Sequence, residues 1–398
     1  MSTAAGAHVV VVGGGLVAAT LTRELRRLGH TGPITIVSDE AEVPYDRPPL
    51  SKQVLAGTVT PEETRLLKPA DLEDLDVTLR LEQPAAGLNP VAREVELADG
   101  GRLGYDVLVV ATGSRARRLP TVPELSGVHH LRSLDDATAI AEALPGVRRL
   151  VVIGAGFIGL EVAAVARNRD IEVTVVETAA RPLSRVLGED AGEVVIELHE
   201  ERGVEVRCSA TVVEVRGADG VEGVLLDGGE FLPADLLLVG VGAVPNTEWL
   251  EGSGIEIDNG VVCDDRGRTS LPHVYAAGDV ARWRNALTGA HARAEQWQSA
   301  LEQASVVADA VTGGGRVWDT VPYFWSDQYD RKLQFCGAAG PVSERRDTAR
   351  GPVVLFGDGD EQLVGVLTVG NPRALAQGRR LVAAGTAWPQ AQEWLAGL

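Results

Sequence analysis

The sequence predicts an α/β protein with two Rossmann-like nucleotide-binding domains, one inserted in the other, and a small α+β C-terminal domain. A run of β-branched residues that ends in a G-x-G-x-x-[GA] turn occurs at 9–18 and again at 150–159. A strand-like run that ends in glycine, as at the exit from such a domain, also occurs twice, at 103–113 and 234–242. One glycine turn often serves packing alone, but two copies in the same context indicate two dinucleotide sites.

The first glycine turn belongs to a strand–turn–helix unit that Gly29 ends. A second hydrophobic strand, at 34–37, ends in Asp39, about 20 residues past the glycines, where an acid accepts hydrogen bonds from a ribose. A pyrophosphate would lie on the helix N-terminus. The backbone that would approach it belongs to Gly13, Gly15, Leu16, Val17 and Ala18.

A proline-rich segment follows at 43–52, and it ends in Lys52. Two consecutive prolines, Pro48 and Pro49, predict an extended, rigid backbone, and rigid loops often carry site residues. Strand-like runs come next at 77–81 and 94–97, before the exit strand.

The second glycine turn has the same surroundings as the first. Its strand at 173–176 ends in Glu177, an acid that favours NADH because it would repel a 2′-phosphate. Arg181 and Arg185 follow closely, and each is either a nucleotide contact or a surface charge. The turn itself contributes Gly154, Gly156, Phe157, Ile158 and Gly159.

The chain then returns to the first domain. A strand at 274–281 carries Gly278 and Asp279 at a helix start, where backbone amides meet phosphate and a carboxylate meets a hydroxyl. After the glycine hinge at 313–315, strands at 333–336, 353–356 and 363–369 and a helix at 372–384 form a third unit. The predicted domains are 1–118 with 244–316, the inserted 119–243, and a C-terminal interface domain at 317–398.

Composition excludes several classes of protein. The chain has 398 residues, 45% of them hydrophobic, which is enough for two or three domains with real cores. A net charge of −19 argues against nucleic acid and anionic membranes as partners. The longest apolar runs are too short to span a bilayer. The first residues show no basic region followed by an apolar one, so we expect a cytoplasmic protein.

Cysteine and histidine usage adds two further exclusions. Cys208, Cys263 and Cys336 are widely spaced, so no pair is available for a redox disulfide near either glycine turn. The seven histidines are scattered, and no cluster has metal-ligand spacing. We therefore expect neither disulfide chemistry nor a metal site.

Beyond the glycine turns, the chain resembles the NADH-dependent, FAD-containing ferredoxin reductases of oxygenase systems, in the glutathione-reductase-like structural group. The resemblance covers essentially the whole chain. The sequence departs from it at Ser38, a position where relatives often have glycine. It rests on the segments PYDRPPLSK at 44–52, ATG at 111–113, GAGFIGLE at 154–161, GD at 278–279 and FWSDQY at 324–329.

This resemblance implies that the first domain binds FAD and the inserted domain binds NADH. Lys52 and Glu161 would pair beside the flavin, where a cation favours the anionic reduced ring. A solvated loop lysine and an ordinary helix glutamate are the alternative. The implied FAD contacts also include Asp39, Arg47, Ala111, Thr112, Gly113, Arg132, Gly278, Asp279, Trp297 and Trp325. Either tryptophan is alternatively a core anchor.

The implied reaction passes a hydride from NADH to FAD and then single electrons to a [2Fe–2S] ferredoxin. An acidic ferredoxin would need a local basic patch, for which the candidates are Arg331, Lys332, Arg345, Arg346, Arg379 and Arg380. One alternative is a related reductase of rubredoxin, of a nitrite reductase module or of oxygen. Another is a signalling flavoprotein like apoptosis-inducing factor. A disulfide reductase would need a cysteine pair.

Overall fold

The computed structural model describes residues 6–287, 289–359 and 361–398, apart from the side chains of 185, 186 and 189. Contacts divide the chain into two compact units. Unit 1 comprises Met1–Asp46, Glu62–Arg115 and Ala243–Thr320, and unit 2 comprises Arg47–Pro61, Ala116–Gly242 and Val321–Leu398. Two of the crossings between the units are within β8 (Ser114–Ala116) and at the start of β17 (Ala243–Pro245), two strands that pair with each other.

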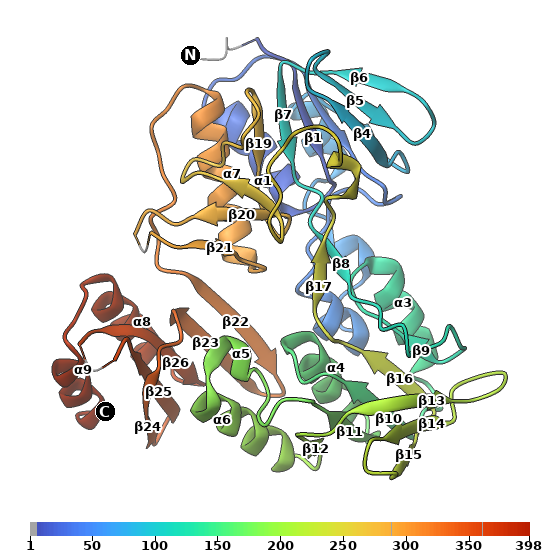
Figure 1. The fold of residues 1–398 in the computed structure, drawn as a ribbon, viewed down its shortest axis with the longest axis vertical. Helices are drawn as coiled ribbons and strands as arrows, with labels where there is room; N and C mark the ends of the chain where they lie inside the picture. The colour runs from blue at the N-terminus through green and yellow to red at the C-terminus, as the bar shows by residue number, and fades with distance from the viewer. Residues whose placement is uncertain (1–5, 288, 360) are drawn as a thin grey trace. The chain divides into compact units, whose positions relative to one another are not determined.

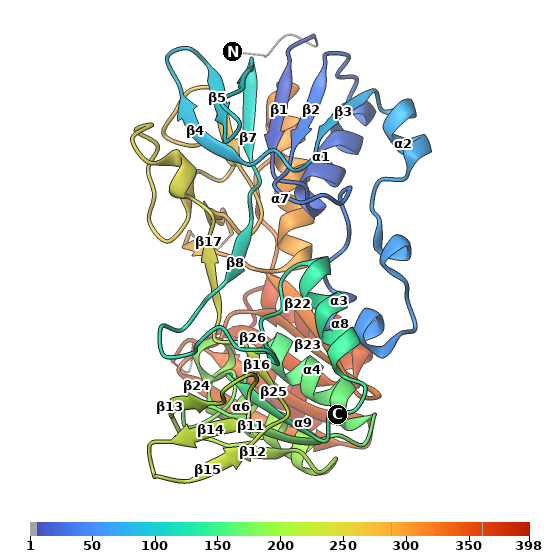
Figure 2. The ribbon, with the colours of Figure 1, turned by 90° about the vertical axis from the view of Figure 1, so that its right-hand side faces the viewer.

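Unit 1 is built on a parallel five-stranded sheet. Its order is β19-β7-β1-β2-β3, with β1 at the centre (Figure 2). The strands are β1 (Val9–Val12), β2 (Ile34–Val37), β3 (Val77–Arg80), β7 (Val107–Val110) and β19 (Val274–Ala276). Every residue of β1, β2 and β7 is buried, as expected of parallel strands covered on both faces.

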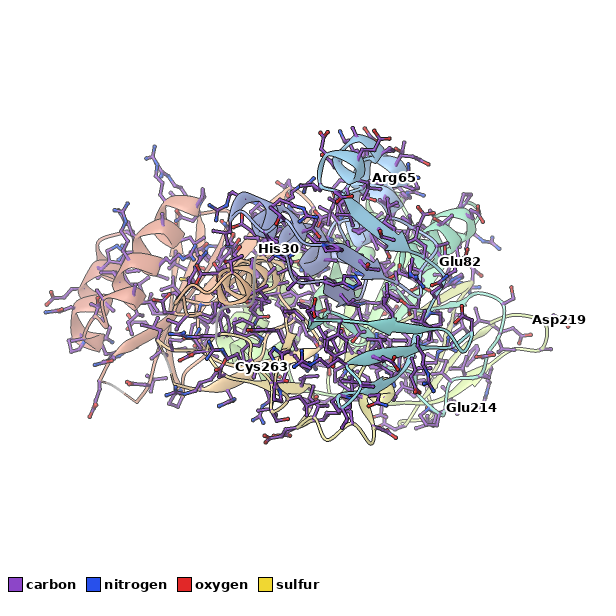
Figure 3. The ribbon with its side chains drawn as sticks, turned by 90° about the horizontal axis from the view of Figure 1, so that it is seen from above. His30, Arg65, Glu82, Glu214, Asp219 and Cys263 are labelled. Carbon is purple, nitrogen blue, oxygen red and sulfur yellow. The ribbon has the colours of Figure 1, made fainter. Side chains whose placement is uncertain are left out.

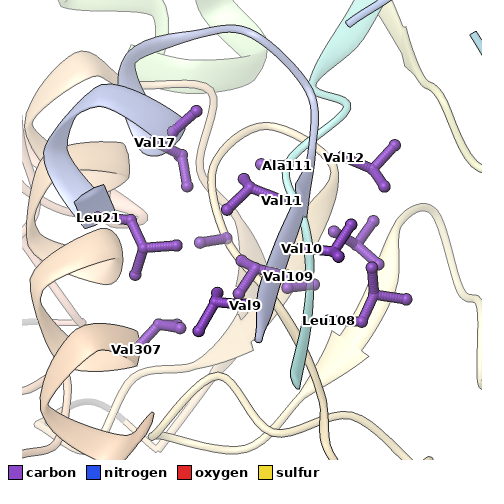
Figure 4. Close-up of a cluster of buried hydrophobic side chains, with 14 of the residues drawn as sticks. Val9, Val10, Val11, Val12, Val17, Leu21, Leu108, Val109, Ala111 and Val307 are labelled. Carbon is purple, nitrogen blue, oxygen red and sulfur yellow. The ribbon is translucent and has the colours of Figure 1, made fainter. Parts of the chain in front are cut away.

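Helices α1 (Leu16–Arg27) and α7 (Trp297–Val311) pack together against one face of this sheet. Figure 4 shows Val9 and Val11 on the same side as Val17, Leu21 and Val307 of these helices. The helix α7 was not expected from the sequence. Its glutamines and serines blur the apolar pattern, yet most of its residues are buried.

Smaller elements complete unit 1. Two three-stranded sheets comprise β4 (Ala85–Asn89), β5 (Glu94–Leu97) and β6 (Arg102–Gly104), and β18 (Val261–Cys263), β20 (Ala281–Arg284) and β21 (His291–Arg293). Short helices are η2 (Pro61–Thr64), α2 (Pro69–Asp74) and η3 (Glu248–Leu250). The single exit strand expected at 103–113 is thus two strands, β6 and β7, in different sheets.

Unit 2 contains a second parallel five-stranded sheet, of order β12-β11-β10-β16-β9. Its strands are β9 (Val128–His129), β10 (Arg149–Ile153), β11 (Glu172–Val176), β12 (Glu205–Arg207) and β16 (Leu236–Val239). Its helices are α3 (Leu134–Ala143), α4 (Phe157–Arg167), α5 (Ser184–Leu187) and α6 (Glu189–Glu200). A three-stranded sheet of β13 (Val212–Arg216), β14 (Gly223–Leu226) and β15 (Phe231–Pro233) is added to it; Figure 3 labels Glu214 and Asp219 of this region.

The C-terminal part of unit 2 is an antiparallel five-stranded sheet, of order β22-β23-β26-β25-β24, with two helices (Figure 1). The elements are β22 (Tyr323–Gln328), β23 (Arg331–Gly337), β24 (Val342–Thr348), β25 (Gly351–Gly357), β26 (Leu363–Val369), α8 (Pro372–Ala383) and α9 (Trp388–Ala396). Three of these strands and α8 match the predicted elements. The others were not predicted, β24 because its sequence is almost entirely polar.

The proline-rich segment differs from the expectation. Pro49 has helical dihedrals, φ −66° and ψ −21°, and a π-helical turn, η1 (Leu50–Val54), begins directly after it. The prediction of an extended backbone was wrong because proline restricts φ but is well tolerated at a helix start. The turn places Ser51 and Lys52 side by side in unit 2, and this arrangement builds the site described below.

Candidate functional site

The first glycine turn has the geometry of a phosphate cradle. Gly13 has φ +123°, and a Cβ there would collide with the carbonyl oxygen of Ala111, so the position requires glycine. Gly15 is the N-cap of α1, and a Cβ there would meet open space among the described residues. Leu16, Val17 and Ala18 form the first turn of α1, with their amides at this open end. The turn therefore fits a pyrophosphate.

The acidic end of β2 lies beside this turn. Asp39 is exposed directly after β2, while Ser38 is buried and its Oγ accepts from the amide of Glu40 at 3.1 Å. A Cβ on Gly14 would lie 2.6 Å from the Ser38 Oγ, so this serine packs against the glycine turn. The departure from the resemblance at residue 38 is thus accommodated by Gly14.

The carboxyl ends of β7 and β19 bring two further predicted segments together at the same sheet edge. Ser114, which follows the Ala111–Thr112–Gly113 turn, donates to Asp279 at 3.3 Å. Gly278 and Asp279 were predicted at a helix start, but a turn and then the strand β20 follow them. Gly278 has φ +78°, and a Cβ there would lie 2.8 Å from a Val17 methyl, at the start of α1. Ligands bind at this edge in open α/β sheets. The predicted contacts of unit 1 therefore share one edge.

Two residues that the sequence did not indicate hold this edge. Gln303 of α7 is fully buried and accepts from the Gly278 amide at 2.8 Å. Thr112 donates to the carbonyl of Asn246 at 2.8 Å, and the Asn246 amide donates to the carbonyl of Thr112 at 2.9 Å. Neither Asn246 nor Gln303 belongs to a recognised sequence motif, so their role at this edge is visible only in the tertiary structure.

Trp297 is the first residue of α7 and is half-buried. Its Nε1 donates to Asp46 Oδ1 at 2.7 Å, which ties α7 to the beginning of the proline-rich segment. A buried indole N–H normally finds such a partner. A contact of Trp297 with FAD stays a prediction.

The second glycine turn, in unit 2, repeats the geometry of the first. Gly154 has φ +96°, and a Cβ there would collide with the carbonyl oxygen of Gly240. A Cβ on Gly159 would lie 2.6 Å from the Gly154 carbonyl, so α4 packs closely on β10. Gly156 is the N-cap of α4, Phe157 and Ile158 form its first turn, and Ile158 is exposed.

Glu177 does more than the sequence indicated. Its Oε2 accepts from the Ala155 amide and its Oε1 from the Ala179 amide, both at 2.8 Å. The carboxylate therefore braces the glycine turn and keeps lone pairs for ribose hydroxyls. Arg181 is engaged by Glu193 at 2.6 Å, while the side chain of Arg185 lies outside the described residues.

Lys52 and Glu161 form a buried ion pair in unit 2. Lys52 Nζ lies 2.8 Å from Glu161 Oε2, and the two side chains are 12% and 5% exposed. Lys52 also donates to the Pro48 carbonyl at 3.0 Å. Glu161 accepts hydrogen bonds from Ser51 and Ser326, the latter at 2.5 Å. A buried pair is costly unless such extra bonds satisfy it, so this site is specifically built.

Glu161 lies on the second turn of α4. It faces β22, where Phe324, Ser326 and Gln328 alternate as buried residues. Three residues of this site were not predicted: Ser51, Ser326 and Gln328. A signal was available in the sequence. Phe324, Ser326 and Gln328 are spaced two residues apart, so in a strand they lie on one face, which makes the polar pair candidates for burial beside Phe324.

Three other residues predicted to contact the flavin are also in unit 2. Arg47 Nη1 donates to the Arg132 carbonyl at 2.7 Å, so these two are neighbours. Trp325 lies on the face of β22 opposite to Ser326, and its ring is 6.1 Å from that of Tyr323 and 5.6 Å from Lys332 Nζ. Flavin contacts of all three stay predictions.

The three cysteines form no disulfide. All three are free, and burial raises the pKa of Cys208 and Cys263, and that of Cys336 to about 11. Cys263, labelled in Figure 3, is buried in β18. Among the described residues no group of three or more histidines, cysteines and acids could hold a metal ion. Within the same residues, the search for a helix able to cross a bilayer found none.

Comparisons with known proteins agree with this geometry. Residues 7–304 match the family described as pyridine nucleotide-disulphide oxidoreductase, and residues 323–394 match the reductase C-terminal family. A ferredoxin–NAD(P)(+) reductase of Sphingomonas sp is 39% identical, over 94% of this chain and 92% of that protein. A rubredoxin–NAD(+) reductase of Ectopseudomonas oleovorans is 37% identical, over 83% and 86%.

Solved structures give the same result. A chain of the covalent putidaredoxin reductase–putidaredoxin complex superposes with a TM-score of 0.92 at 35% identity, covering 95% of this chain and 93% of that one.

Proposed function

Because the chain belongs to the pyridine nucleotide-disulphide oxidoreductase family, we propose that it is an NADH-dependent reductase of a [2Fe–2S] ferredoxin that feeds a monooxygenase or dioxygenase. The chain is an oxidoreductase of a class that uses FAD and NAD(P)H. The observation that carries the proposal is the buried Lys52–Glu161 pair, which a nucleotide-binding fold alone does not require. Two of the relatives serve protein electron carriers by name, a ferredoxin and putidaredoxin.

The two glycine turns divide the cofactors between the units. In unit 1, Gly13, Gly15 and the start of α1 would hold the pyrophosphate of FAD, with Asp39 toward the ribose. In unit 2, Gly154, Gly156 and α4 would hold NADH. FAD, when bound, accepts two electrons as hydride and releases them singly.

Lys52 and Glu161 supply the electrostatics. The Lys52 ammonium is held by Glu161 and the Pro48 carbonyl, so its charge is fixed in place before reaction. A preorganised cation favours a site where negative charge develops. Glu161 keeps that cation from being an unpaired buried charge. FAD would also be contacted by Arg47, Arg132 and Trp325.

Glu177 sets the preference for NADH over NADPH. Its carboxylate is oriented by two backbone amides, so it presents negative charge at a defined place beside the glycine turn. A 2′-phosphate would meet this charge at short range. Arg181, four residues after Glu177, is paired with Glu193 and offers little compensation.

The electron acceptor must dock on a protein of net charge −19. Several of the predicted docking bases are engaged within the chain. Lys332 lies 2.6 Å from Asp327, Arg345 lies 2.6 Å from Glu197, and Arg346 donates to the Leu395 carbonyl. Arg331 lies 3.7 Å from Asp330, and the Arg379 guanidinium lies 5.5 Å from the centre of the Tyr323 ring. This leaves Arg380, which is exposed on α8, as the remaining candidate for an acidic carrier.

The test is anaerobic stopped-flow absorbance of the yellow protein mixed with NADH and then with an oxidised [2Fe–2S] ferredoxin. We expect fast flavin bleaching, followed by reoxidation as the ferredoxin is reduced. Slow bleaching with a long-lived charge-transfer band would instead favour a signalling flavoprotein. Fast bleaching without ferredoxin reduction would point to another acceptor.

Rubredoxin is the second candidate acceptor, favoured by the similarity to rubredoxin–NAD(+) reductase. The same stopped-flow mixing with oxidised rubredoxin in place of ferredoxin compares the two rates directly.

We place the reaction in the cytoplasm, because cysteines that are all free fit a reducing compartment.

A further inference from the structure

The Lys52–Glu161 pair is the inner end of a longer buried chain of hydrogen bonds in unit 2. Ser326, which bonds Glu161, lies 3.1 Å from Gln328 Nε2. Gln328 Oε1 lies 3.0 Å from His199 Nε2, and His199 Nδ1 lies 3.1 Å from the Tyr329 hydroxyl. Ser326, Gln328 and His199 are all 0% exposed. The chain thus joins α4, β22 and α6 through polar atoms alone.

An ionised Glu161 forces a single direction on this chain. A carboxylate has no hydrogen, so Ser326 must donate to it. Ser326 has spent its hydrogen and must accept the next one, so Gln328 presents its amide nitrogen to Ser326 and its oxygen to His199. His199 must then carry its hydrogen on Nε2, and its Nδ1 accepts from Tyr329. Every donor therefore points toward Glu161.

A hydrogen placed on the Glu161 side would favour the opposite direction, because in the original direction Ser326 would accept two hydrogen bonds and its own buried hydrogen would not be donated. Ser326 would accept from residue 161 and donate to the Gln328 oxygen, so the Gln328 amide would turn over. His199 would then accept at Nε2 and carry its hydrogen on Nδ1, toward the Tyr329 oxygen. The chain has two self-consistent arrangements, and they differ in the tautomer of a histidine that does not touch Glu161.

The surroundings keep His199 neutral, as both arrangements require. Burial lowers the pKa of His199 to about 4, against a partial offset from the Gln328 hydrogen bond, and Arg202 lowers it further. Burial also raises the pKa of Tyr329 to about 12, so its hydroxyl keeps its hydrogen. Arg202 lies 4.8 Å from the centre of the Tyr329 ring and donates to Asp330. Tyr329 and Arg202 are therefore the outer end of the hydrogen-bond chain.

We propose that His199 is a positioning residue: through Gln328 and Ser326 it fixes the donors that hold the Glu161 carboxylate on Lys52. The role of Glu161 itself rests on the proposed function. A simpler interpretation exists, because buried polar side chains are normally hydrogen-bonded. It does not predict that the charge of residue 161 sets the tautomer of His199.

The decisive variant is Glu161→Gln. Lys52 and Ser51 both point at the Oε2 position, so the amide oxygen of the new side chain takes that place and its NH₂ faces Ser326. The chain then reverses. We expect ¹⁵N NMR of histidine-labelled holoprotein to show His199 switching from the Nε2–H to the Nδ1–H tautomer. The control Glu172→Gln makes the same charge change on the exposed start of β11 and should leave His199 as it is.

A second pair of variants tests the coupling from the other end. His199→Phe removes the Nε2–H donor, whereas His199→Gln offers an amide N–H in its place. We expect His199→Phe to slow flavin reduction by NADH by up to about tenfold, the scale of one lost hydrogen bond, and His199→Gln to restore most of that loss. Equal effects of the two variants would contradict the proposal.

The outcomes separate this inference from the function on which it rests. An unchanged His199 tautomer in Glu161→Gln would overturn the coupling, whatever the enzyme does with NADH. A tautomer switch without any change in flavin reduction in Glu161→Gln would leave the coupling intact and remove the proposed catalytic role of the pair. Thermal unfolding of each variant is measured alongside, so that a misfolded protein is not mistaken for either result.

Discussion

At the scale of single residues, the ion pair of unit 2 is costly to bury but holds a positive charge at a fixed place. Lys52 and Glu161 are almost completely buried, and each would be a strongly unfavourable charge without the other. Three neutral groups, the Pro48 carbonyl and the hydroxyls of Ser51 and Ser326, complete their coordination. Such an arrangement restricts where the ammonium can be, which is what preorganised electrostatic stabilisation needs.

Lys52→Ala should slow hydride transfer about 100-fold while FAD stays bound, since a fixed cation contributes on this scale. Stopped-flow flavin reduction by NADH measures the rate, and the flavin absorbance of the desalted protein measures retention. Glu161→Ala should slow the reaction similarly, and it should also destabilise the fold by about 3 kcal/mol or more by leaving Lys52 buried and unpaired. Unchanged reduction kinetics in both variants would remove the role proposed for the pair.

Glu177→Gln should narrow the preference for NADH over NADPH by about tenfold, because it removes the charge but keeps an acceptor for a backbone amide. The ratio of kcat/KM values with the two nucleotides is the measurement. Glu172→Gln, at the start of the same strand, is the matched control. An unaltered ratio in Glu177→Gln would refute the ribose assignment.

At the scale of elements, both glycine turns are explained by backbone contacts. Gly13 and Gly154 each have positive φ and lie against a carbonyl oxygen of a neighbouring strand end. Gly15 is different, because there is room for a side chain at its position. The first kind of glycine is required by the fold, and we propose that the second is required by the ligand.

Gly13→Ala and Gly15→Ala should therefore fail differently. Gly13→Ala should give poorly folded protein, because its Cβ collides with the Ala111 carbonyl. Gly15→Ala should fold normally but bind FAD about tenfold or more weakly, because its Cβ occupies the phosphate's place. Circular dichroism reports the fold, and fluorescence titration of the apoprotein reports FAD affinity. Normal FAD affinity in Gly15→Ala would argue against this cradle.

The elements that were predicted wrongly from the sequence each have a physical cause. β24 is polar because it is the edge strand of its sheet, paired on one side with β25. The turn η1 was mistaken for extended chain, since the conformation of a Pro-Pro pair depends on what it caps. Continuous apolar runs that end in a glycine turn, such as β1 and β10, were predicted correctly, because parallel strands covered on both faces are apolar along their length.

At the scale of the whole molecule, buried His199 makes stability depend on pH. Its pKa is about 4 in the folded protein against 6.5 for an ordinary histidine. The unfolded chain therefore takes up the proton first as the pH falls. The stability that neutral His199 contributes is fully present above pH 6.5, declines between pH 6.5 and about pH 4, and is lost below that range. This pKa difference corresponds to about 3 kcal/mol of unfolding free energy.

His199→Gln should flatten this dependence, because an amide does not titrate. Urea denaturation of the FAD-loaded protein and the variant at several pH values between 4 and 7 measures the effect. We expect the wild-type chain to lose more stability than the variant across that window. Parallel curves for the two proteins would contradict the assignment of this dependence to His199.

The amino-acid sequence determined the parts of this protein that depend on neighbours along the chain. Strand, glycine turn, helix and terminal acid lie within about 30 residues of one another in each nucleotide-binding motif, so pattern alone indicated the fold class, the two dinucleotides and Glu177. Lys52 and Glu161 came from the resemblance to a family. Only the tertiary structure showed that Ser326 and His199 are joined to them, because 165 residues separate Ser326 from Glu161 and 129 separate Gln328 from His199. Contacts across such distances depend on how α4, α6 and β22 pack, and no local pattern encodes that packing.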